Sequence, residues 1–348
     1  MGSRASDSAE FGFDPPAVCG GVQPGLLSME IELSLRCNFH CPYCYVPTPA
    51  DLGGELTADE IRDVVRQARD LGARRIIVLG GEPTLYPGLG TLLRWIAGQG
   101  LEIELFTNGS GITAALAATL AELQVRVVVK RNSFDDPLQD RLAGRPGAAA
   151  VIGRAFTLLD RAGYPGEGRF LALSTIICRQ NYDELPALWC WARDRHIAPY
   201  VEILTPQANA RRNRWLEVAP ADLHRLFRRI AAIDRACYGR HWTVQPPLVG
   251  QRCLRHQFSC LVTARGEVMP CVGVTVSMGN IRRRPLARIL AESPVLADLR
   301  NYRQTIKGPC RTCDLAATCY GCRGAAYQLT GDYLASDPLC WRNVPAGH

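Results

Sequence analysis

Residues 28–44 read Ser-Met-Glu-Ile-Glu-Leu-Ser-Leu-Arg-Cys-Asn-Phe-His-Cys-Pro-Tyr-Cys. The apolar stretch Met29–Leu35 predicts a strand, and cysteines 37, 41 and 44 follow it with C-x3-C-x2-C spacing. Three thiolates from one loop can bind three irons of a cubane cluster and leave the fourth iron open to a reactant. Structural zinc sites are closed by four ligands instead, and His40 as a fourth ligand is the alternative interpretation.

The alternation of strand and helix continues for about 200 residues. Apolar, often β-branched segments predict further strands at Arg75–Leu79, Leu101–Phe106, Val125–Lys130, Phe170–Ile177 and Tyr200–Leu204. Helices are predicted between and after them at Leu89–Ala97, Ala114–Leu123, Ala148–Ala162, Asp183–Arg195 and Ala221–Arg235, and a capping box at Thr57–Glu60 opens one more. Such a pattern predicts an α/β fold whose parallel sheet has right-handed crossovers.

The pattern changes after about residue 240, where Pro246-Pro247 interrupts the chain and cysteines become dense. Ser259–Thr263 and Glu267–Met269 predict a hairpin. We therefore expect an N-terminal extension at 1–27, a barrel domain at 28–240 and a metal-stabilised module at 241–348.

Fifteen cysteines favour metal binding or catalysis over disulfides, since we expect a cytoplasmic protein. The chain has no apolar run near 18 residues and no signal-peptide pattern, so no membrane contact is predicted. A formal charge of +7 suggests a nucleic-acid partner. If eleven of the cysteines bind three [4Fe-4S] clusters, however, the thiolate-bound clusters contribute a charge of roughly −5. No nucleic-acid partner is therefore expected. The short basic patches at 211–214 and 282–284 indicate a solvated surface or a contact for an anionic substrate group or redox partner.

The cysteine loop, with Tyr43 before its third cysteine, resembles the signature of the radical S-adenosylmethionine (SAM) superfamily. Two further motifs agree: Gly80-Gly81-Glu82-Pro83 resembles the family's GGEP motif, and Thr107-Asn108 follows the next strand. The resemblance implies a partial (β/α)6 TIM-like barrel over about 29–235, with its functional face at the carboxyl ends of the strands. It implies that Cys37, Cys41 and Cys44 bind a [4Fe-4S] cluster that cleaves SAM to a 5′-deoxyadenosyl radical. A flavodoxin- or ferredoxin-type electron donor is implied as well.

By the same resemblance, Glu82 accepts a hydrogen bond from the SAM ammonium group. The implied SAM contacts are Tyr43, Gly80, Gly81, Glu82, Pro83, Thr107, Asn108, Lys130 and Ser133. The sequence departs from the family after the fourth strand, where Lys130-Arg131-Asn132-Ser133 replaces Ser-Leu-Asp. The arginine that holds the SAM carboxylate is also missing from its usual place, and Lys130, Arg141 and Arg145 are the candidates to replace it.

The cysteines after residue 250 closely resemble the SPASM domain of radical SAM enzymes, apart from x2 instead of x3 between Cys319 and Cys322. The resemblance implies two auxiliary [4Fe-4S] clusters, and hence three clusters in all. One takes Cys253, Cys260, Cys271 and Cys322, and the other takes Cys310, Cys313, Cys319 and Cys340. Two four-cysteine zinc sites are the alternative.

Four cysteines remain. Cys190 and Cys237 sit in helical patterns and are predicted to be small core residues, and Cys19 has no assignable role. Cys178 ends the fifth strand, and there a thiol could return a hydrogen atom to a substrate radical. Core packing is the alternative interpretation.

Three classes of function stay open on the sequence. SPASM peptide maturases commonly carry an N-terminal recognition domain, whereas about 27 residues precede the first strand here. Sulfatase-maturing enzymes typically have an aspartate at the position of Val272, so this valine counts against that subfamily. The leading hypothesis is therefore an oxidoreductase or epimerase acting on a sugar-like small molecule, as in aminoglycoside or aminocyclitol antibiotic biosynthesis. A peptide maturase is the alternative, and a non-catalytic zinc-stabilised scaffold is the remote one.

Overall fold

The computed structural model describes residues 25–47 and 49–343. Cys19 and nearly all of the extension predicted at 1–27 lie outside the described residues. The six predicted strands form one parallel sheet in the order β6-β5-β4-β3-β2-β1. They are β1 (Ser28–Glu32), β2 (Arg75–Leu79), β3 (Glu102–Thr107), β4 (Arg126–Lys130), β5 (Leu171–Ile177) and β6 (Ala198–Ile203). The predicted α/β partial barrel is confirmed.

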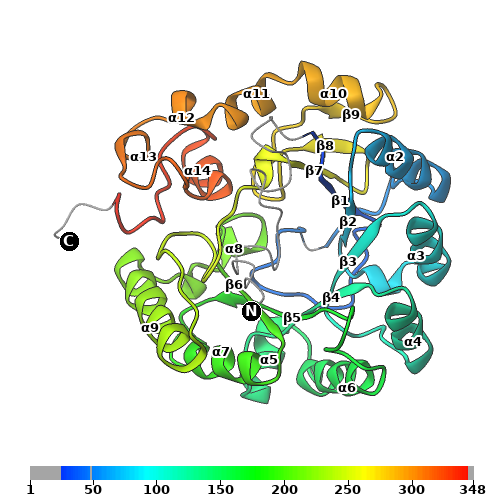
Figure 1. Cartoon of the computed structure of the whole chain (residues 1–348), viewed down its shortest axis with the longest axis horizontal. Coiled ribbons are helices and arrows are strands. Elements are labelled where there is room, and N and C mark those ends of the chain that lie inside the picture. Colours follow the sequence, from blue (N-terminus) through cyan, green and yellow to red (C-terminus); the bar gives the residue numbers. More distant parts are fainter. Residues whose placement is uncertain (1–24, 48, 344–348) are drawn as a thin grey trace, which may run out of the picture.

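Helices surround the curved sheet on its outer side (Figure 1). They are α2 (Ala58–Asp70), α3 (Leu89–Gly98), α4 (Ala114–Glu122), α5 (Asp136–Ala143), α6 (Ala148–Arg161), α7 (Leu185–Asp194) and α9 (Pro220–Tyr238). The short α8 (Asn209–Arg212) lies inside this ring, beside β6 (Figure 1). Each longer helix buries an apolar stripe against the strands, as α2 does with Ile61, Val64 and Val65. The main apolar core therefore lies between the helices and the sheet, and the opposite face of the strands lines the barrel interior.

The capping box that opens α2 also contacts the C-terminal part of the chain. The Thr57 side chain accepts a hydrogen bond from the Glu60 amide at 3.2 Å, and the Thr57 amide donates to Glu60 Oε2 at 2.8 Å. Arg282 pairs with the same Glu60 carboxylate at 2.6 Å. This member of the basic patch at 282–284 thus serves an internal contact.

The predicted hairpin forms, and it extends the barrel sheet. Its strands are β7 (Ser259–Val262) and β8 (Glu267–Met269), followed by β9 (Gly279–Asn280). Strand β7 pairs in parallel with β1, and Cys260 lies opposite Met29. The sheet therefore crosses the domain boundary predicted near 240, because β1 offers a free edge that the hairpin fills.

The other edge of the sheet is covered in a similar way. The Ile203 amide donates to the Pro247 carbonyl at 3.0 Å, and the Val249 amide donates to the Val201 carbonyl at 2.9 Å. Beyond the hairpin lie α10 (Leu286–Glu292), α11 (Pro294–Arg300), α12 (Tyr302–Thr305), α13 (Pro309–Thr312) and α14 (Arg323–Thr330). None of the helices in the described ranges has the length and apolar character needed to cross a bilayer.

Candidate active site

Backbone hydrogen bonds hold the cysteine loop against the turn that follows β2. The Gly81 amide donates to the Ser34 carbonyl, and the Glu82 amide donates to the Arg36 carbonyl, both at 2.8 Å. A Cβ atom on Gly81 would stand 2.3 Å from the Arg36 carbonyl oxygen. This close approach requires glycine, which explains the Gly-Gly pair in physical terms.

A cavity of about 240 Å³ opens at the carboxyl ends of the strands. Cys37, Cys41 and Cys44 line it. Most of the predicted SAM contacts line it too: Tyr43, Gly80, Gly81, Glu82, Thr107, Asn108 and Lys130. Residues from four strand ends thus meet in one cavity, as expected for the functional face of such a barrel.

Glu82 organises the polar side of this cavity. Its carboxylate accepts hydrogen bonds from the Thr107 hydroxyl at 2.5 Å and from the Asn108 amide at 2.6 Å, and Thr84 donates to it as well. Burial raises the pKa of Glu82, and no lysine or arginine of the described residues forms an ion pair with it. A buried carboxylate without a cationic partner is suited to bind an ammonium group.

The three thiols are partly buried. Burial raises the pKa of Cys41 to about 12 and that of Cys44 to about 11. The ammonium group of Lys130 lies close enough to favour both thiolates, and it donates to the Ser174 hydroxyl at 3.3 Å. A metal cluster would therefore have to displace the thiol protons to bind here.

A second cavity of about 200 Å³ adjoins the first. Tyr45, Phe106, Glu202, Val272 and Gly273 are among the residues that line both. Three cysteines of the C-terminal part line the second cavity, namely Cys253, Cys271 and Cys322. The Cys322 side chain accepts from the Ala325 amide at 3.4 Å at the start of α14, which favours a thiolate.

The other cysteine group lies further along the chain. Cys310 and Cys313 are close enough to influence the pKa of Cys319, and Cys310 and Cys319 influence that of Cys340. Cys310 Sγ accepts from the Asn343 side chain at 3.2 Å. The four cysteines predicted for the second auxiliary cluster are thus brought together.

Among the described residues, no three His, Cys, Asp or Glu side chains converge closely enough to hold a single metal ion. A cubane cluster binds each thiolate on a different iron.

Comparison with known proteins agrees with this geometry. Residues 31–188 match the radical SAM superfamily, and residues 253–314 match the SPASM iron–sulfur cluster-binding domain. A PqqA peptide cyclase from Streptomyces rochei is 32% identical over 93% of this chain and 90% of its own length. The chain belongs to the radical SAM superfamily.

Other similar proteins have lower sequence identity. An AdoMet-dependent heme synthase from Methanosarcina barkeri is 28% identical over 89% of this chain and 94% of its own. Among solved structures, SuiB from Streptococcus suis bound to the precursor peptide SuiA has a TM-score of 0.70 at 17% identity, covering 91% of this chain and 76% of that one. The protein anSMEcpe with AdoMet and a peptide has a TM-score of 0.69 at 16% identity, covering 91% and 94%.

The cofactors of this radical SAM enzyme are therefore SAM, the [4Fe-4S] cluster that binds it, and auxiliary iron–sulfur clusters. The residues present fit these groups, because a buried carboxylate without a cationic partner in the described residues, a glycine cradle and three cysteines line one cavity. Cys37, Cys41 and Cys44 would hold the cluster, and Glu82 would hold the SAM ammonium group. The individual assignments stay predictions.

Two predicted SAM contacts lie away from the cavity. Pro83 does not line it, and the Ser133 hydroxyl donates to Glu184 at 2.6 Å inside the fold. The neighbouring Asn132, which sequence reasoning passed over, donates to the Tyr43 hydroxyl at 2.7 Å and accepts from the Ile176 amide. It therefore connects the cysteine loop to β5, and the departure from Ser-Leu-Asp at this position was the signal for it.

The arginine candidates differ in position. The Arg145 guanidinium lies over the Phe39 ring and donates to the Asn38 carbonyl at 3.4 Å, beside the cysteine loop. The Arg141 guanidinium instead lies over the Trp215 ring. Lys130 alone of the three lines the cavity, so it stays our candidate for the SAM carboxylate.

The remaining cysteines lie outside the cavity lining. Cys178 is buried in a small apolar cluster with Ile176, Leu204 and Leu216. The prediction that Cys237 is a core residue is wrong, because its side chain is exposed at the end of α9, whereas Cys190 is partly buried. Cys178 does not itself line the cofactor cavity, although Ile176 and Leu204 of the same cluster do, and its role as a hydrogen donor stays a prediction.

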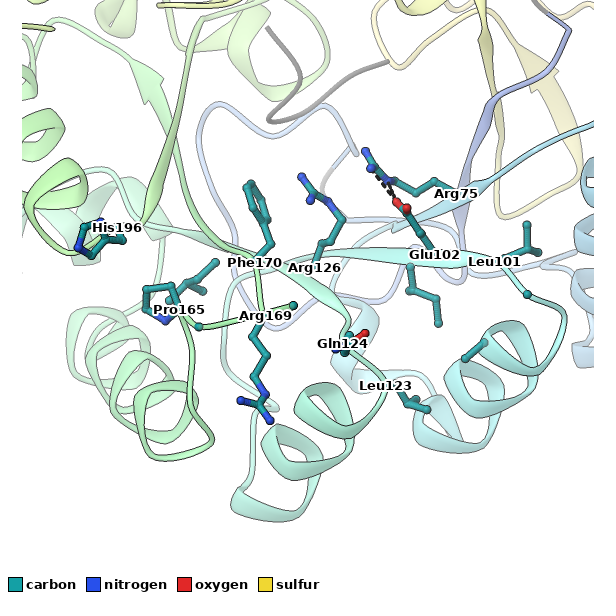
Figure 2. A pocket seen from close by; sticks show the side chains of 16 residues that line it. Arg75, Leu101, Glu102, Leu123, Gln124, Arg126, Pro165, Arg169, Phe170 and His196 are labelled. Atoms are coloured by element: carbon teal, nitrogen blue, oxygen red, sulfur yellow. Dashed lines mark hydrogen bonds and ion pairs between the residues drawn. The ribbon is translucent and has the colours of Figure 1, made fainter. Parts of the chain in front are cut away.

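A larger cavity, of about 830 Å³, lies at the amino ends of the strands (Figure 2). Figure 2 shows Arg75 directed at Glu102, with Arg126, Phe170 and His196 around the same space. None of the predicted cofactor residues lines this cavity.

Proposed function

We propose that this enzyme modifies a peptide by radical chemistry. The observation that carries the proposal is the 32% identity, over nearly the full length of both chains, with a protein named as a peptide cyclase. When bound, SAM and its cluster supply a 5′-deoxyadenosyl radical that removes a hydrogen atom from the substrate. The chain's own residues would hold the reacting group in the closed space between the first cavity and the auxiliary cysteines.

A surface groove offers a path for an extended peptide. A third cavity of about 360 Å³ shares Ile203 and Leu204 with the cofactor cavity. Its lining is largely apolar and includes Leu223, Leu329 and Leu339. Leu329 is 48% exposed, which makes it one of two large apolar side chains exposed in the described part of the chain. A peptide segment lying in this groove would reach the cofactor cavity, whereas a sugar-sized substrate would not need it.

The direct test uses peptides encoded by short open reading frames beside the gene. Each synthetic peptide is incubated without oxygen with the reconstituted enzyme, SAM and dithionite, and its mass is measured. We expect one peptide to lose hydrogen in step with 5′-deoxyadenosine formation. If the enzyme is active in cleaving SAM and no neighbouring peptide changes mass, the peptide proposal is wrong.

A matched pair of variants tests the groove. Leu329→Asp places a charge where the peptide would pack, and we expect KM for the peptide to rise roughly tenfold. Leu52, which is 39% exposed and does not line the groove, provides the control Leu52→Asp with unchanged KM. SAM cleavage without peptide should be the same in both variants.

Dehydrogenation or epimerisation of a sugar-like small molecule is the second candidate. The similarity to a heme synthase favours it, because that relative is named for making a small molecule. This candidate is tested by incubating the reconstituted enzyme with aminocyclitols and measuring 5′-deoxyadenosine. A substrate should increase its release. If the substrate is such a small molecule, Leu329→Asp should leave its KM unchanged.

A further inference from the structure

The cavity that holds the three auxiliary cysteines is also lined by a histidine, the side chain among its other polar lining residues that is best suited to replace a thiolate on iron. His256 lines it together with Cys253, Cys271 and Cys322. The side chain is only 2% exposed, and neither ring nitrogen has a hydrogen-bond partner among the described residues. A buried imidazole with two unsatisfied nitrogens is costly unless something outside the protein chain binds it.

The SPASM resemblance assigns Cys260 to the same auxiliary cluster as Cys253, Cys271 and Cys322. Its side chain, however, points away from their cavity and into the apolar core. Strand β7 pairs with β1 so that Cys260 lies beside Met29, and both side chains belong to the apolar core between the sheet and the helices. Cys253, Cys271 and Cys322 influence one another electrostatically, whereas no cysteine is among the groups that influence Cys260, which are Glu30 and Arg300. Because alternate residues of a strand point to opposite faces, Cys260 cannot turn into the cavity without shifting the register of β7.

We propose that His256 is the fourth protein ligand of the auxiliary cluster held by Cys253, Cys271 and Cys322, in place of Cys260. Cys253 and His256 have C-x2-H spacing, and both line the same cavity, with His256 held in a 3₁₀ turn at Arg255–Gln257. Tyr320 contacts both residues, with its hydroxyl 3.8 Å from Cys253 Sγ and its ring centroid 5.3 Å from the imidazole.

The surroundings keep the imidazole in the form that binds iron. Burial, helped by the charges of Arg255 and Arg323, lowers the pKa of His256 to about 3, so the ring is neutral near pH 7. Exchange of one thiolate for a neutral imidazole makes the cluster one charge less negative, and histidine ligation raises the potential of iron–sulfur centres in the same way elsewhere. The cluster nearest the SAM cavity would therefore accept electrons more readily than a four-thiolate cluster.

The deciding measurement uses the full-length enzyme, reconstituted without oxygen and reduced in the absence of SAM. The protein is prepared with natural histidine and with ¹⁵N-histidine, and electron spin-echo envelope modulation is recorded on both. We expect a nitrogen coupling of directly bound imidazole that changes with the label. If the wild-type clusters show no histidine coupling, the proposal is overturned, and this readout depends neither on the substrate nor on activity.

Variants then locate the ligand. His256→Ala should lose the coupling, whereas the exposed control His241→Ala should keep it. Cys260→Ala should retain the coupling and the full iron content of about twelve per chain. If a folded Cys260→Ala protein loses about four irons while His256→Ala keeps them, Cys260 is the ligand and the proposal is wrong. If Cys260→Ala fails to fold, the wild-type spectrum still decides.

Discussion

The two ends of the parallel sheet differ in how their charged groups are satisfied. At the amino ends, the cavity is the larger of the two, but two of its arginines form ion pairs with glutamates of the protein. Arg75 pairs with Glu102 at 2.7 Å and Arg126 with Glu104 at 2.8 Å, and Figure 2 shows the first of these pairs. At the carboxyl ends, Glu82 is buried and three thiols are partly buried, and Glu82 has no arginine or lysine ion pair in the described ranges. Charges that already have partners indicate structural support, whereas buried groups lacking such partners indicate a missing ligand.

The largest effect should follow from removing a thiol at the carboxyl ends. We expect Cys41→Ala to abolish SAM cleavage, because the cluster loses one of its three protein ligands. Iron content should fall from about twelve to about eight per chain, since the auxiliary clusters remain. Cys237→Ala, at an exposed cysteine, is the control and should keep both properties. Substantial 5′-deoxyadenosine from Cys41→Ala would contradict the assignment of the first cluster.

Replacing a single carboxylate at each end sharpens the comparison. Glu82→Gln removes the negative charge predicted to hold the SAM ammonium group, and it sets an amide donor against the donors Thr107 and Asn108. We expect the dissociation constant for SAM, measured by calorimetry on the reconstituted enzyme, to rise at least roughly tenfold. Glu102→Gln removes a carboxylate of the other cavity and should leave SAM affinity unchanged. Equal losses in both variants would mean that general destabilisation, and no direct contact, explains the effect.

The amino end should show the reverse pattern, with stability affected and binding preserved. Arg126→Gln leaves Glu104 buried, with 2% of its side chain exposed, and removes a close charged partner. We expect a loss of about 3 kcal/mol in the free energy of unfolding, measured with urea. SAM affinity of the folded fraction should not change. The exposed pair of Arg94 and Glu122 supplies the control Arg94→Gln, for which no measurable loss is expected.

Strand periodicity predicted the barrel well, because six buried parallel strands leave a strong apolar signal in the sequence. The positions of the strand ends were predicted less accurately. Strand β1 ends at Glu32, whereas the prediction extended it to Leu35, because the chain turns there into the cysteine loop. The motifs predicted most of the cofactor cavity for a similar reason, since consecutive strand ends necessarily meet at one edge.

Properties that depend on pairing between distant segments were beyond the sequence. From the cysteine spacing alone, Cys260 and Cys253 are equally good candidates for cluster ligands. Only the pairing of β7 with β1 shows that the Cys260 side chain points to the face of the sheet opposite the auxiliary-cysteine cavity. His256 lies in no motif, and its unsatisfied nitrogens become visible only when its neighbours are known. The groove around Leu329 joins the start of α9 to α14, about 100 residues further along the chain.

The smallest effect is expected at Cys178, which lies near the carboxyl ends but packs like a core residue. Its neighbours Ile176, Leu204 and Leu216 are apolar, and burial raises the pKa of its thiol. Cys178→Ala should therefore cost about 1 kcal/mol of stability and leave the product formed per 5′-deoxyadenosine within twofold of wild type. The decisive readout is the reaction in D2O, because a thiol donor exchanges with solvent and would place deuterium on the reacting carbon. Deuterium in the wild-type product that disappears in Cys178→Ala would show that the apolar cluster opens during turnover, and the hydrogen-donor role would then hold despite the packing.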